Sequence, residues 1–269
     1  MSFLRYFMGL RIRPICHAVH RQWALLNGAV LFYSCLPLPK GWPVAFDKIA
    51  LVVPGVGLGL GGLLAGIDVL LGVMEWPLAL RSALVIFAGV WLTGGLHLDG
   101  AMDTADGLAV QDPQRRLTVM ADSHAGAFGV MVAIAILLLK ITALAATTQH
   151  RWFALLFAAA WGRWGQQWAI GSYVYLKPDG KGAFHKQALP SRWQTLPWAV
   201  VLLGLTILAG ALGLVPWSYG MTVAAMGVGG SWWVAAWLNR RLKGHTGDTY
   251  GAVVEWVEVA VLVGLAGVG

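Results

Sequence analysis

The chain has 269 residues, of which 58% are hydrophobic and 12% charged, and its formal net charge is +7. A soluble globular protein carries roughly 25% charged residues, so this composition excludes an ordinary soluble domain and predicts an integral membrane protein. Basic residues of such proteins gather in cytoplasmic loops, so the positive charge does not indicate a nucleic-acid partner, and we expect none.

Residues 1–49 form a basic region without the features of a secretory signal. Arg5, Arg11 and Arg13 interrupt its apolar stretches, and no small-residue cleavage site follows them. We expect this region to lie on the anionic cytoplasmic leaflet. The stretch 24–39 is apolar but short and ends in prolines, which favours an interfacial or re-entrant segment over a span.

Seven longer apolar runs follow, each near the roughly 20 residues that cross about 30 Å of hydrocarbon as a helix. They cover residues 50–74, 77–97, 128–148, 152–172, 195–215, 218–238 and 252–269. The runs are too continuous for the alternating strands of a barrel. The sequence therefore predicts an all-α polytopic membrane bundle of about seven helices, forming a single domain over residues 1–269.

The distribution of Lys and Arg predicts the orientation of this bundle. With a cytoplasmic N-terminus and seven spans counted from residue 50, the cytoplasmic side holds 15 of the 19 basic residues. This bias agrees with the positive-inside rule. We therefore expect a multi-pass protein of the bacterial inner membrane with three long cytoplasmic connections, at residues 98–127, 173–194 and 239–251.

The connection 98–127 concentrates negative charge. Asp99, Asp103 and Asp106 stand at i, i+4 and i+7, so they fall within about 60° of one another on a helix. Crowded carboxylates repel one another, whereas Mg²⁺ and Mn²⁺ prefer carboxylate oxygens as ligands. The spacing predicts a Mg²⁺ site, with Mn²⁺ as a substitute, and Asp122 from a second short helix as a further ligand.

Other residues of this connection are assigned to turns and packing. Gly100 and Gly107 flank the acids and are expected to leave room for a bulky ligand. Asp112 precedes Pro113, and the residue before a proline is pushed out of the helical region. We therefore expect Asp112 to be a turn residue that ends the acidic helix, outside the metal site.

Four basic residues on the same side are candidates for binding phosphate. Arg115 and Arg116 stand near the start of the second short helix, and a guanidinium can hold a phosphate through its planar fork of donors. Lys177 and Lys181 surround a Pro-Asp-Gly turn and suit an anionic ligand. The positive-inside bias alone explains the two lysines equally well.

The last connection adds two acids. Asp248 and Glu255 are seven residues apart and share a helix face, and Glu258 lies one turn deeper in an apolar run. Acids inside a membrane are costly and usually functional. Asp248 is expected to join the metal site or to accept a hydrogen bond from a substrate hydroxyl, and Glu255 to line the same site. The alternatives are a helix cap for Asp248 and packing partners for the glutamates.

Histidines and basic residues near these motifs have structural interpretations. We expect His97, His124 and His245 to make structural hydrogen bonds, with His97 on the side of its helix opposite the aspartates. Lys140 and Arg163 lie inside predicted spans, where they are expected to snorkel or pair. Arg163 facing the active cavity is an equal alternative.

Acids that hold a divalent metal beside basic residues suit attack on a pyrophosphate, because the cation neutralises charge on the transferred and leaving phosphates. Composition and spacing thus predict a membrane-embedded, metal-dependent phosphotransferase without naming its substrate.

Three stretches carry a family resemblance: "GGLHLDGAMDTADGL" (94–108), "MADSHAGAFGV" (120–130) and "GHTGDTYGAVVE" (244–255). Together they resemble the adenosylcobinamide-GDP ribazoletransferases, the cobalamin (5′-phosphate) synthases. The stretches "FYSCLPLP" and "GRWG…YLKPDGKGAF" support the match in the expected order. The resemblance extends over nearly the whole chain.

The resemblance implies a Mg²⁺-dependent inner-membrane transferase with its active site on the cytoplasmic face. Such an enzyme joins adenosylcobinamide-GDP to α-ribazole or α-ribazole 5′-phosphate, releases GMP, and forms adenosylcobalamin or its 5′-phosphate. It also implies that Asp99, Asp103, Asp106 and Asp122 carry the metal and pyrophosphate chemistry, with Asp248 in the same cavity. Membrane lipid is a further expected partner. Oligomerisation, or a complex with other corrinoid-assembly enzymes, is left open.

Two alternative functions are weighed against this one. A CDP-alcohol phosphotransferase has an aspartate-rich helix whose beginning is similar to Asp103-x-x-Asp106-Gly107, but the rest of that motif is missing here. A divalent-cation transporter would need acids at mid-membrane, whereas the main acidic cluster lies in a connection.

Overall fold

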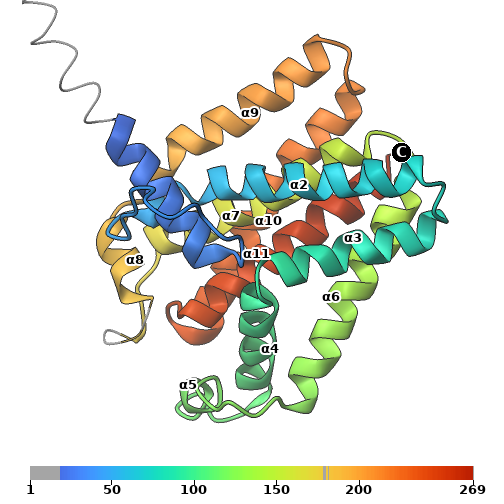
Figure 1. The fold of residues 1–269 in the computed structure, drawn as a ribbon. Helices are drawn as coiled ribbons and strands as arrows, with labels where there is room; N and C mark the ends of the chain where they lie inside the picture. Colours follow the sequence, from blue (N-terminus) through green and yellow to red (C-terminus); the bar gives the residue numbers. More distant parts are fainter. Residues whose placement is uncertain (1–18, 178–179, 181, 269) are drawn as a thin grey trace, which may run out of the picture.

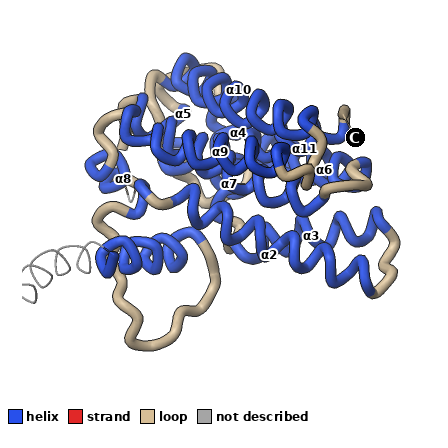
Figure 2. The backbone as a smooth tube through the Cα atoms, turned by 90° about the horizontal axis from the view of Figure 1, so that it is seen from above, coloured by secondary structure: helices blue, strands red, loops and turns tan. Residues whose placement is uncertain are grey.

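The computed structural model describes residues 19–177, 180 and 182–268, and within these ranges it contains helices and loops but no β-strand (Figures 1 and 2). A helix over residues 19–33 comes first. The later α-helices are α2 (Val53–Val73), α3 (Leu78–Leu92), α4 (Leu96–Ala109), α5 (Arg116–Val119), α6 (Ala127–Ala146), α7 (Arg151–Ser172), α8 (Ala183–Ala188), α9 (Leu196–Ala211), α10 (Trp217–Leu242) and α11 (Gly247–Ala266). The predicted all-α class is confirmed.

Five helices of the described chain are long and apolar enough to cross a membrane. They are α2, α6, α10, α11 and α9 together with the short turn before it. The pair α3 and α4 adds a sixth if it is counted as one bent span. Helix α7 has 22 residues but carries several buried polar side chains. Within the described residues five or six helices are thus candidate spans, compared with the predicted number of about seven.

Helix α7 lies at the centre of the bundle, packed against α2, α10 and α11 (Figure 1). Most of its residues are buried, which explains how it keeps Arg163, Gln166 and Gln167 away from lipid. Gly57 and Gly61 of α2 let the two backbones meet, because a Cβ at either position would lie within 2.7 Å of a carbonyl oxygen of α7. Small residues at such contacts are typical of packed membrane helices.

The predicted span over residues 77–97 is wrong as a single helix. Helix α3 ends at Leu92, and α4 begins at Leu96 at an angle of 88° to it. Gly94 and Gly95 make the turn with φ of 61° and 72°, a left-handed region that favours glycine. Helix α4 therefore does not continue the path of α3, and its acids lie outside the five spanning helices.

The loop after the first described helix folds back along that helix, and the start of the loop contacts the end of α3. Ala45 N–H donates to the Ala24 carbonyl at 2.9 Å, so the loop 34–48 returns along the helix. Cys35 N–H then donates to the Leu92 carbonyl at 2.7 Å. The predicted segment 24–39 is thus part helix and part loop. Residues 1–18 of the predicted basic region lie outside the described residues.

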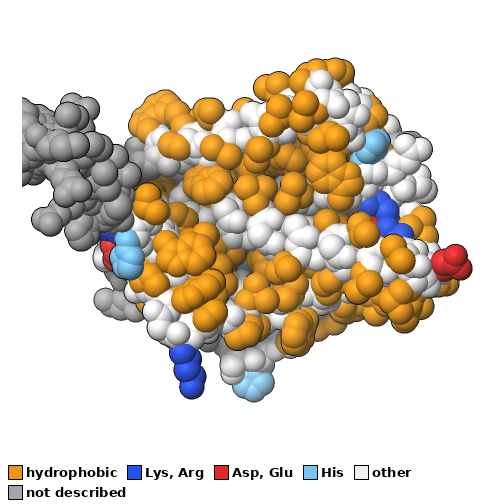
Figure 3. Space-filling view, turned by 45° about the horizontal axis from the view of Figure 1, so that its top comes forward, with side chains coloured by type: hydrophobic (Ala, Val, Ile, Leu, Met, Phe, Trp, Pro, Cys, Tyr) orange, Lys and Arg blue, Asp and Glu red, His pale blue; other side chains and the backbone are white. Residues whose placement is uncertain are grey.

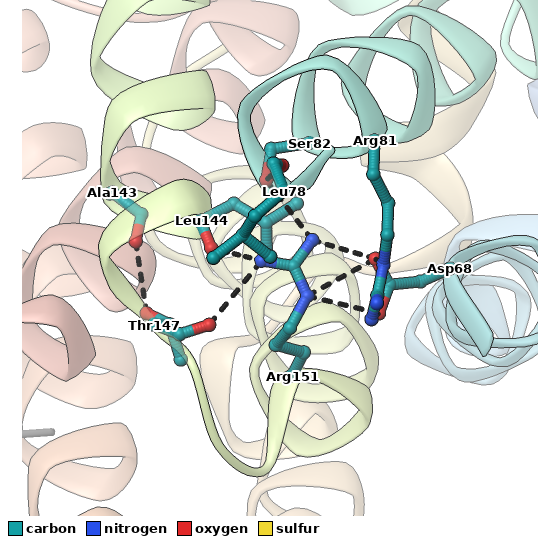
Figure 4. A network of polar contacts seen from close by, with 8 residues as sticks. All are labelled: Asp68, Leu78, Arg81, Ser82, Ala143, Leu144, Thr147 and Arg151. Atoms are coloured by element: carbon teal, nitrogen blue, oxygen red, sulfur yellow. Dashed lines mark hydrogen bonds and ion pairs between the residues drawn. The ribbon is translucent and has the colours of Figure 1, made fainter. Parts of the chain in front are cut away.

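Apolar side chains cover most of the face shown in Figure 3, with charged groups near its two ends. Inside the bundle the charges are paired. Asp68 of α2 is 2% exposed and accepts hydrogen bonds from Arg81 of α3 and Arg151 of α7, and Arg151 also donates to Ser82 (Figure 4). A buried carboxylate is stable only with such partners, so this network ties three helices together.

We expect Asp68→Asn to lower the free energy of unfolding by about 3–5 kcal/mol, because it leaves the buried guanidinium of Arg151 without a counterion. The matched control is Asp47→Asn, which removes an exposed ion pair with Arg21 and should cost less than about 1 kcal/mol. Urea unfolding of both variants in the same detergent measures the difference. An equal loss of unfolding free energy in both variants would contradict the role of Asp68 as a buried counterion of Arg81 and Arg151.

Candidate active site

Helices α4 and α11 cross in direct backbone contact. A Cβ on Gly100 would lie 2.6 Å from the Asp248 carbonyl oxygen, and one on Gly251 would lie 2.8 Å from the His97 carbonyl oxygen. The space beside Gly100 is therefore filled by α11, and Met120 packs against Gly107. The expectation that Gly100 and Gly107 leave room for a ligand is wrong. The absence of a side chain at Gly100 makes room for the backbone of α11, and its absence at Gly107 makes room for Met120.

This crossing gathers four acids from two helices, which we call the acidic group. Its members are Asp99, Asp103 and Asp106 of α4 and Asp248 of α11. Helix α4 is unbroken from Leu96 to Ala109, so its three aspartates share one face as predicted. Thr246 caps α11, which starts at Gly247 instead of 252 and thereby includes Asp248 in its first turn.

The pKa of Asp103 is raised by its partial burial and by the carboxylates that surround it. Partial burial raises its pKa to about 6, and the charges of Asp99, Asp248 and Asp106 act in the same direction. Lys177 opposes the shift and lies 3.3 Å from the Asp248 carboxylate. The acidic group therefore carries more negative charge than Lys177, its basic neighbour among the described residues, balances.

Asp106 has a structural role that spacing alone did not predict. Its carboxylate accepts the N–H groups of Gly126 and Gly129, both at 2.8 Å, at the start of α6. A carboxylate at a helix N-terminus satisfies free donors and suits the helix dipole. Side chains at either glycine would overlap the Asp106 carboxylate. Asp106 thus fixes α6 to α4, and its predicted role at a metal stays a prediction.

Asp122 is exposed beyond the end of α5 and bonds locally. Its Oδ1 lies 2.6 Å from His124 Nδ1 and accepts the His124 N–H at 3.0 Å. The pairing lowers the pKa of Asp122 and raises that of His124. The described contacts do not join Asp122 to the acidic group. Asp112 accepts the Gln114 N–H at 3.0 Å, which confirms its role in a turn.

Of the four predicted phosphate-binding residues, the structure places Lys177 beside the acidic group. Arg116 donates to the carbonyls of Val110 and Arg241, at 3.1 and 2.9 Å, so its guanidinium joins α5 to the end of α10. Arg115 is exposed on the surface. Lys177 reaches the acidic group, and Lys181 lies outside the described residues. The structure thus brings Lys177 to the site but turns Arg116 away from it.

Glu255 belongs to a buried ion-pair network between α6, α7 and α11. Its carboxylate accepts from Lys140 Nζ at 2.6 Å, and Glu258 pairs with both Lys140 and Arg163. Lys140 and Arg163 therefore pair with acids inside the bundle. Glu255 is 6% exposed with its charge matched, so the structure supports the packing alternative for it over a place in the site.

A cavity of about 250 Å³ lies at the crossing of α4 and α11, and we call it the α4–α11 cavity. It is lined by Phe32, Tyr33, Leu96, His97, Asp99, Gly100, Gln166, Gly182, His185, Gly247, Asp248, Tyr250 and Gly251. Both faces of the first turn of α4 reach it. His97 therefore lines the same cavity as Asp99, although it was expected on the opposite side.

Sequence reasoning missed four polar residues of this lining. Tyr33 and Tyr250 lie inside stretches that carried the family resemblance, but nothing in their spacing marked them. Gln166 is a polar side chain within an apolar run, and that signal could have been used. His185 is brought in by α8 and is 3% exposed.

The arrangement of carboxylates bears on whether Mg²⁺ fits. Within the described ranges, no three His, Cys, Asp or Glu side chains are placed to hold one metal ion. Mg²⁺ usually keeps several waters and binds through one or two carboxylates together with substrate phosphates. Asp99 and Asp248 line one cavity and belong to a group with excess negative charge, so these residues fit a Mg²⁺ ion that shares its ligands with a phosphate.

Comparisons with known proteins cover nearly all of the chain. A family model described as cobalamin-5-phosphate synthase matches residues 25–266. A protein of Synechococcus elongatus named adenosylcobinamide-GDP ribazoletransferase is 49% identical over 91% of this chain and 97% of its own length. Proteins of that name from Trichormus variabilis and Synechocystis sp. are 49% and 46% identical, over 88% and 91% of this chain and 95% and 98% of their own lengths. No solved structure matches the chain.

The raised pKa of Asp103 predicts how stability depends on pH without divalent cations. Its folded-state pKa of about 6 exceeds the ordinary value of 3.8, so its charged form opposes folding. This effect is absent below about pH 4 and grows as the pH rises through about 6. Asp103→Asn should therefore be more stable than the wild type at pH 7.5 in EDTA, and the difference should narrow as the pH falls.

Thermal unfolding in detergent between pH 4.5 and 7.5 measures this difference. Asp112→Asn is the matched control, because Asp112 is exposed in a turn outside the acidic group. A constant difference between Asp103→Asn and the wild type at all pH values would show that Asp103 is not crowded by its neighbours.

Proposed function

The chain belongs to the cobalamin-5-phosphate synthase family, and we propose that it transfers adenosylcobinamide phosphate from adenosylcobinamide-GDP to α-ribazole or α-ribazole 5′-phosphate, with release of GMP. The observation that carries this proposal is the family match over residues 25–266, within which two distant motifs converge on one acidic group. The products are adenosylcobalamin or its 5′-phosphate.

The transfer breaks one phosphoanhydride bond and forms one phosphoester bond. A free ribose hydroxyl of the ribazole substrate attacks the phosphorus attached to cobinamide, and the bond from that phosphorus to the oxygen of GMP breaks. GMP leaves with the bridging oxygen, and the hydroxyl proton passes to a carboxylate. Asp103 suits this proton transfer, because its pKa of about 6 lies closer to neutrality than that of an ordinary aspartate.

In this proposal the acidic group binds the cation, and Lys177 binds a phosphate of the substrate. Mg²⁺, or Mn²⁺ in its place, would be held by Asp99 and Asp248 and would neutralise charge on the two phosphates. Lys177 lies 3.3 Å from Asp248, where its ammonium group can also bind a phosphate oxygen. Asp106 acts as a positioning residue that holds α4 against α6. Direct roles for Arg115, Lys181 and Asp122 remain part of the proposal.

We place the enzyme in the bacterial inner membrane with the acidic group on the cytoplasmic face. Five helices long and apolar enough to span support the membrane location, and the excess of Lys and Arg on one side supports the orientation. The family membership argues against a CDP-alcohol phosphotransferase. A cation transporter is disfavoured because the buried acids Glu255 and Glu258 are already paired with Lys140 and Arg163.

The proposed activity is tested with purified protein in detergent or liposomes, given adenosylcobinamide-GDP, α-ribazole and Mg²⁺. The wild type should form a cobalamin product and GMP in equal amounts. Asp103→Asn should reduce the rate by about 10²–10⁴-fold, because it removes the proton acceptor and one charge of the site. Asp112→Asn, at an exposed turn, should keep the wild-type rate. Full activity of Asp103→Asn would overturn the role given to the acidic group.

Mg²⁺ binding has a readout that does not depend on turnover. A cation that binds the folded protein raises its melting temperature by mass action, so millimolar Mg²⁺ should stabilise the wild type at pH 7.5. The same addition should stabilise Asp103→Asn less, because the repulsion that it relieves is smaller there. An identical rise in both proteins would place the cation elsewhere.

A further inference from the structure

The α4–α11 cavity contains three buried polar atoms that lack a partner within the described structure. They are His97 Nε2, Gln166 Oε1 and the Tyr250 hydroxyl oxygen, on side chains that are 2%, 3% and 2% exposed. Buried polar atoms of folded proteins nearly always have a hydrogen-bond partner. Three orphaned atoms in the lining of one cavity indicate that a ligand supplies the partners.

The hydrogen-bonding character of His97 follows from its neighbour. Arg163 Nη2 lies 3.5 Å from His97 Nδ1, and a guanidinium can only donate, so Nδ1 is the acceptor. A histidine ring whose Nδ1 accepts a hydrogen bond has no proton on that nitrogen. The remaining ring proton is therefore on Nε2, and this atom presents an N–H donor that needs an acceptor.

Apart from Asp99 and Asp248, the rest of the lining is aromatic, aliphatic or glycine. The Tyr33 ring is nearly parallel to the rings of His97 and His185, with centroids 6.3 and 5.7 Å apart. Burial lowers the pKa of His185 to about 4, so this ring is also neutral. Phe32 and Leu96 add apolar walls away from the two aspartates. Such walls suit a planar, largely apolar ring with few hydrogen-bonding atoms.

The size of the cavity limits what it can hold. Sites for drug-sized ligands measure roughly 300–1,000 Å³, whereas this cavity measures about 250 Å³. It can take a nucleoside-sized group but not a corrinoid. Its lining also includes Asp99 and Asp248 of the acidic group, so a group bound inside has its outer end next to the site of phosphate chemistry.

We propose that the α4–α11 cavity binds the nucleoside acceptor by its benzimidazole-type base. His97 Nε2–H donates to the unsubstituted ring nitrogen, and ribose hydroxyls donate to Gln166 Oε1 and to the Tyr250 oxygen. The ribose hydroxyl that attacks the donor then faces Asp99 and Asp248. This inference rests on the proposed function and adds the place where the ribazole substrate binds.

A guanine base fits the same cavity less well. Its edge carries two N–H donor groups besides its acceptors, and the apolar walls at Phe32 and Leu96 would leave some of these unpaired. An unpaired buried polar group is unfavourable. A benzimidazole ring instead has one acceptor nitrogen, which matches the single donor of His97.

The test measures binding to full-length protein in detergent by equilibrium dialysis, with EDTA and without the corrinoid donor. Three probes are compared: α-ribazole, its indole analogue in which CH replaces the acceptor nitrogen, and GMP. For the wild type we expect the analogue to bind about five- to tenfold more weakly than α-ribazole, the loss of one hydrogen bond. His97→Phe should bind these two probes equally.

Two further variants keep the test independent of the folding of His97→Phe. Tyr250→Phe and Gln166→Leu should each weaken α-ribazole binding about five- to tenfold and leave GMP binding unchanged. Tyr219→Phe is the matched control, because Tyr219 is similarly buried but meets the His150 ring edge to face outside the cavity, and it should bind all probes like the wild type.

The outcomes separate this inference from the function on which it rests. If the wild type binds α-ribazole but Tyr250→Phe and Gln166→Leu bind it equally well, the cavity assignment is overturned and the proposed function stands. If the two variants lose GMP binding instead, the cavity holds guanine. If the wild type neither binds α-ribazole nor forms a cobalamin product, the proposed function itself fails.

Discussion

The contact between the backbones of α4 and α11 is the constraint on which the site depends. Gly100 and Gly251 allow it, because any side chain at either position would meet a carbonyl oxygen of the other helix. The contact brings Asp248 beside Asp99 and Asp103, although they are about 150 residues apart in the sequence. It also creates the α4–α11 cavity, since both helices contribute to its walls. The acidic group and the α4–α11 cavity thus both result from the contact between these two helices.

In the described part of the chain, the buried acids of the bundle are paired with basic side chains, whereas the acidic group keeps an excess of negative charge. Asp68 is matched by two arginines, and the network of Glu255 with Lys140 is closed within the helices. Pairing of this kind is needed where water cannot solvate charge. The exposed side of α4 differs, because water, a cation and phosphates can reach it. The uneven charge balance is therefore the feature on which the proposed binding of a cation and phosphates rests.

Periodicity and hydropathy predicted the parts of the fold that are determined locally. The apolar runs became helices, the three aspartates of α4 share a face, and Asp112 occupies the turn before Pro113. The parts that were missed depend on distant partners. Asp106 looks like any other aspartate of its helix until Gly126 and Gly129 are brought to it. Likewise, the pairing of Glu255 with Lys140 joins positions 115 residues apart, and spacing along one helix carries no information about it.

The turn at Gly94 and Gly95 also determines the level at which the acids stand. Had α4 continued straight from α3, Asp99 and Asp106 would differ by about 10 Å along the axis of that helix, at 1.5 Å per residue. The bend of 88° turns this separation sideways, so both acids lie at nearly the same level along that axis. Two glycines thus turn a row of charges that would follow the axis of α3 into one that lies across it.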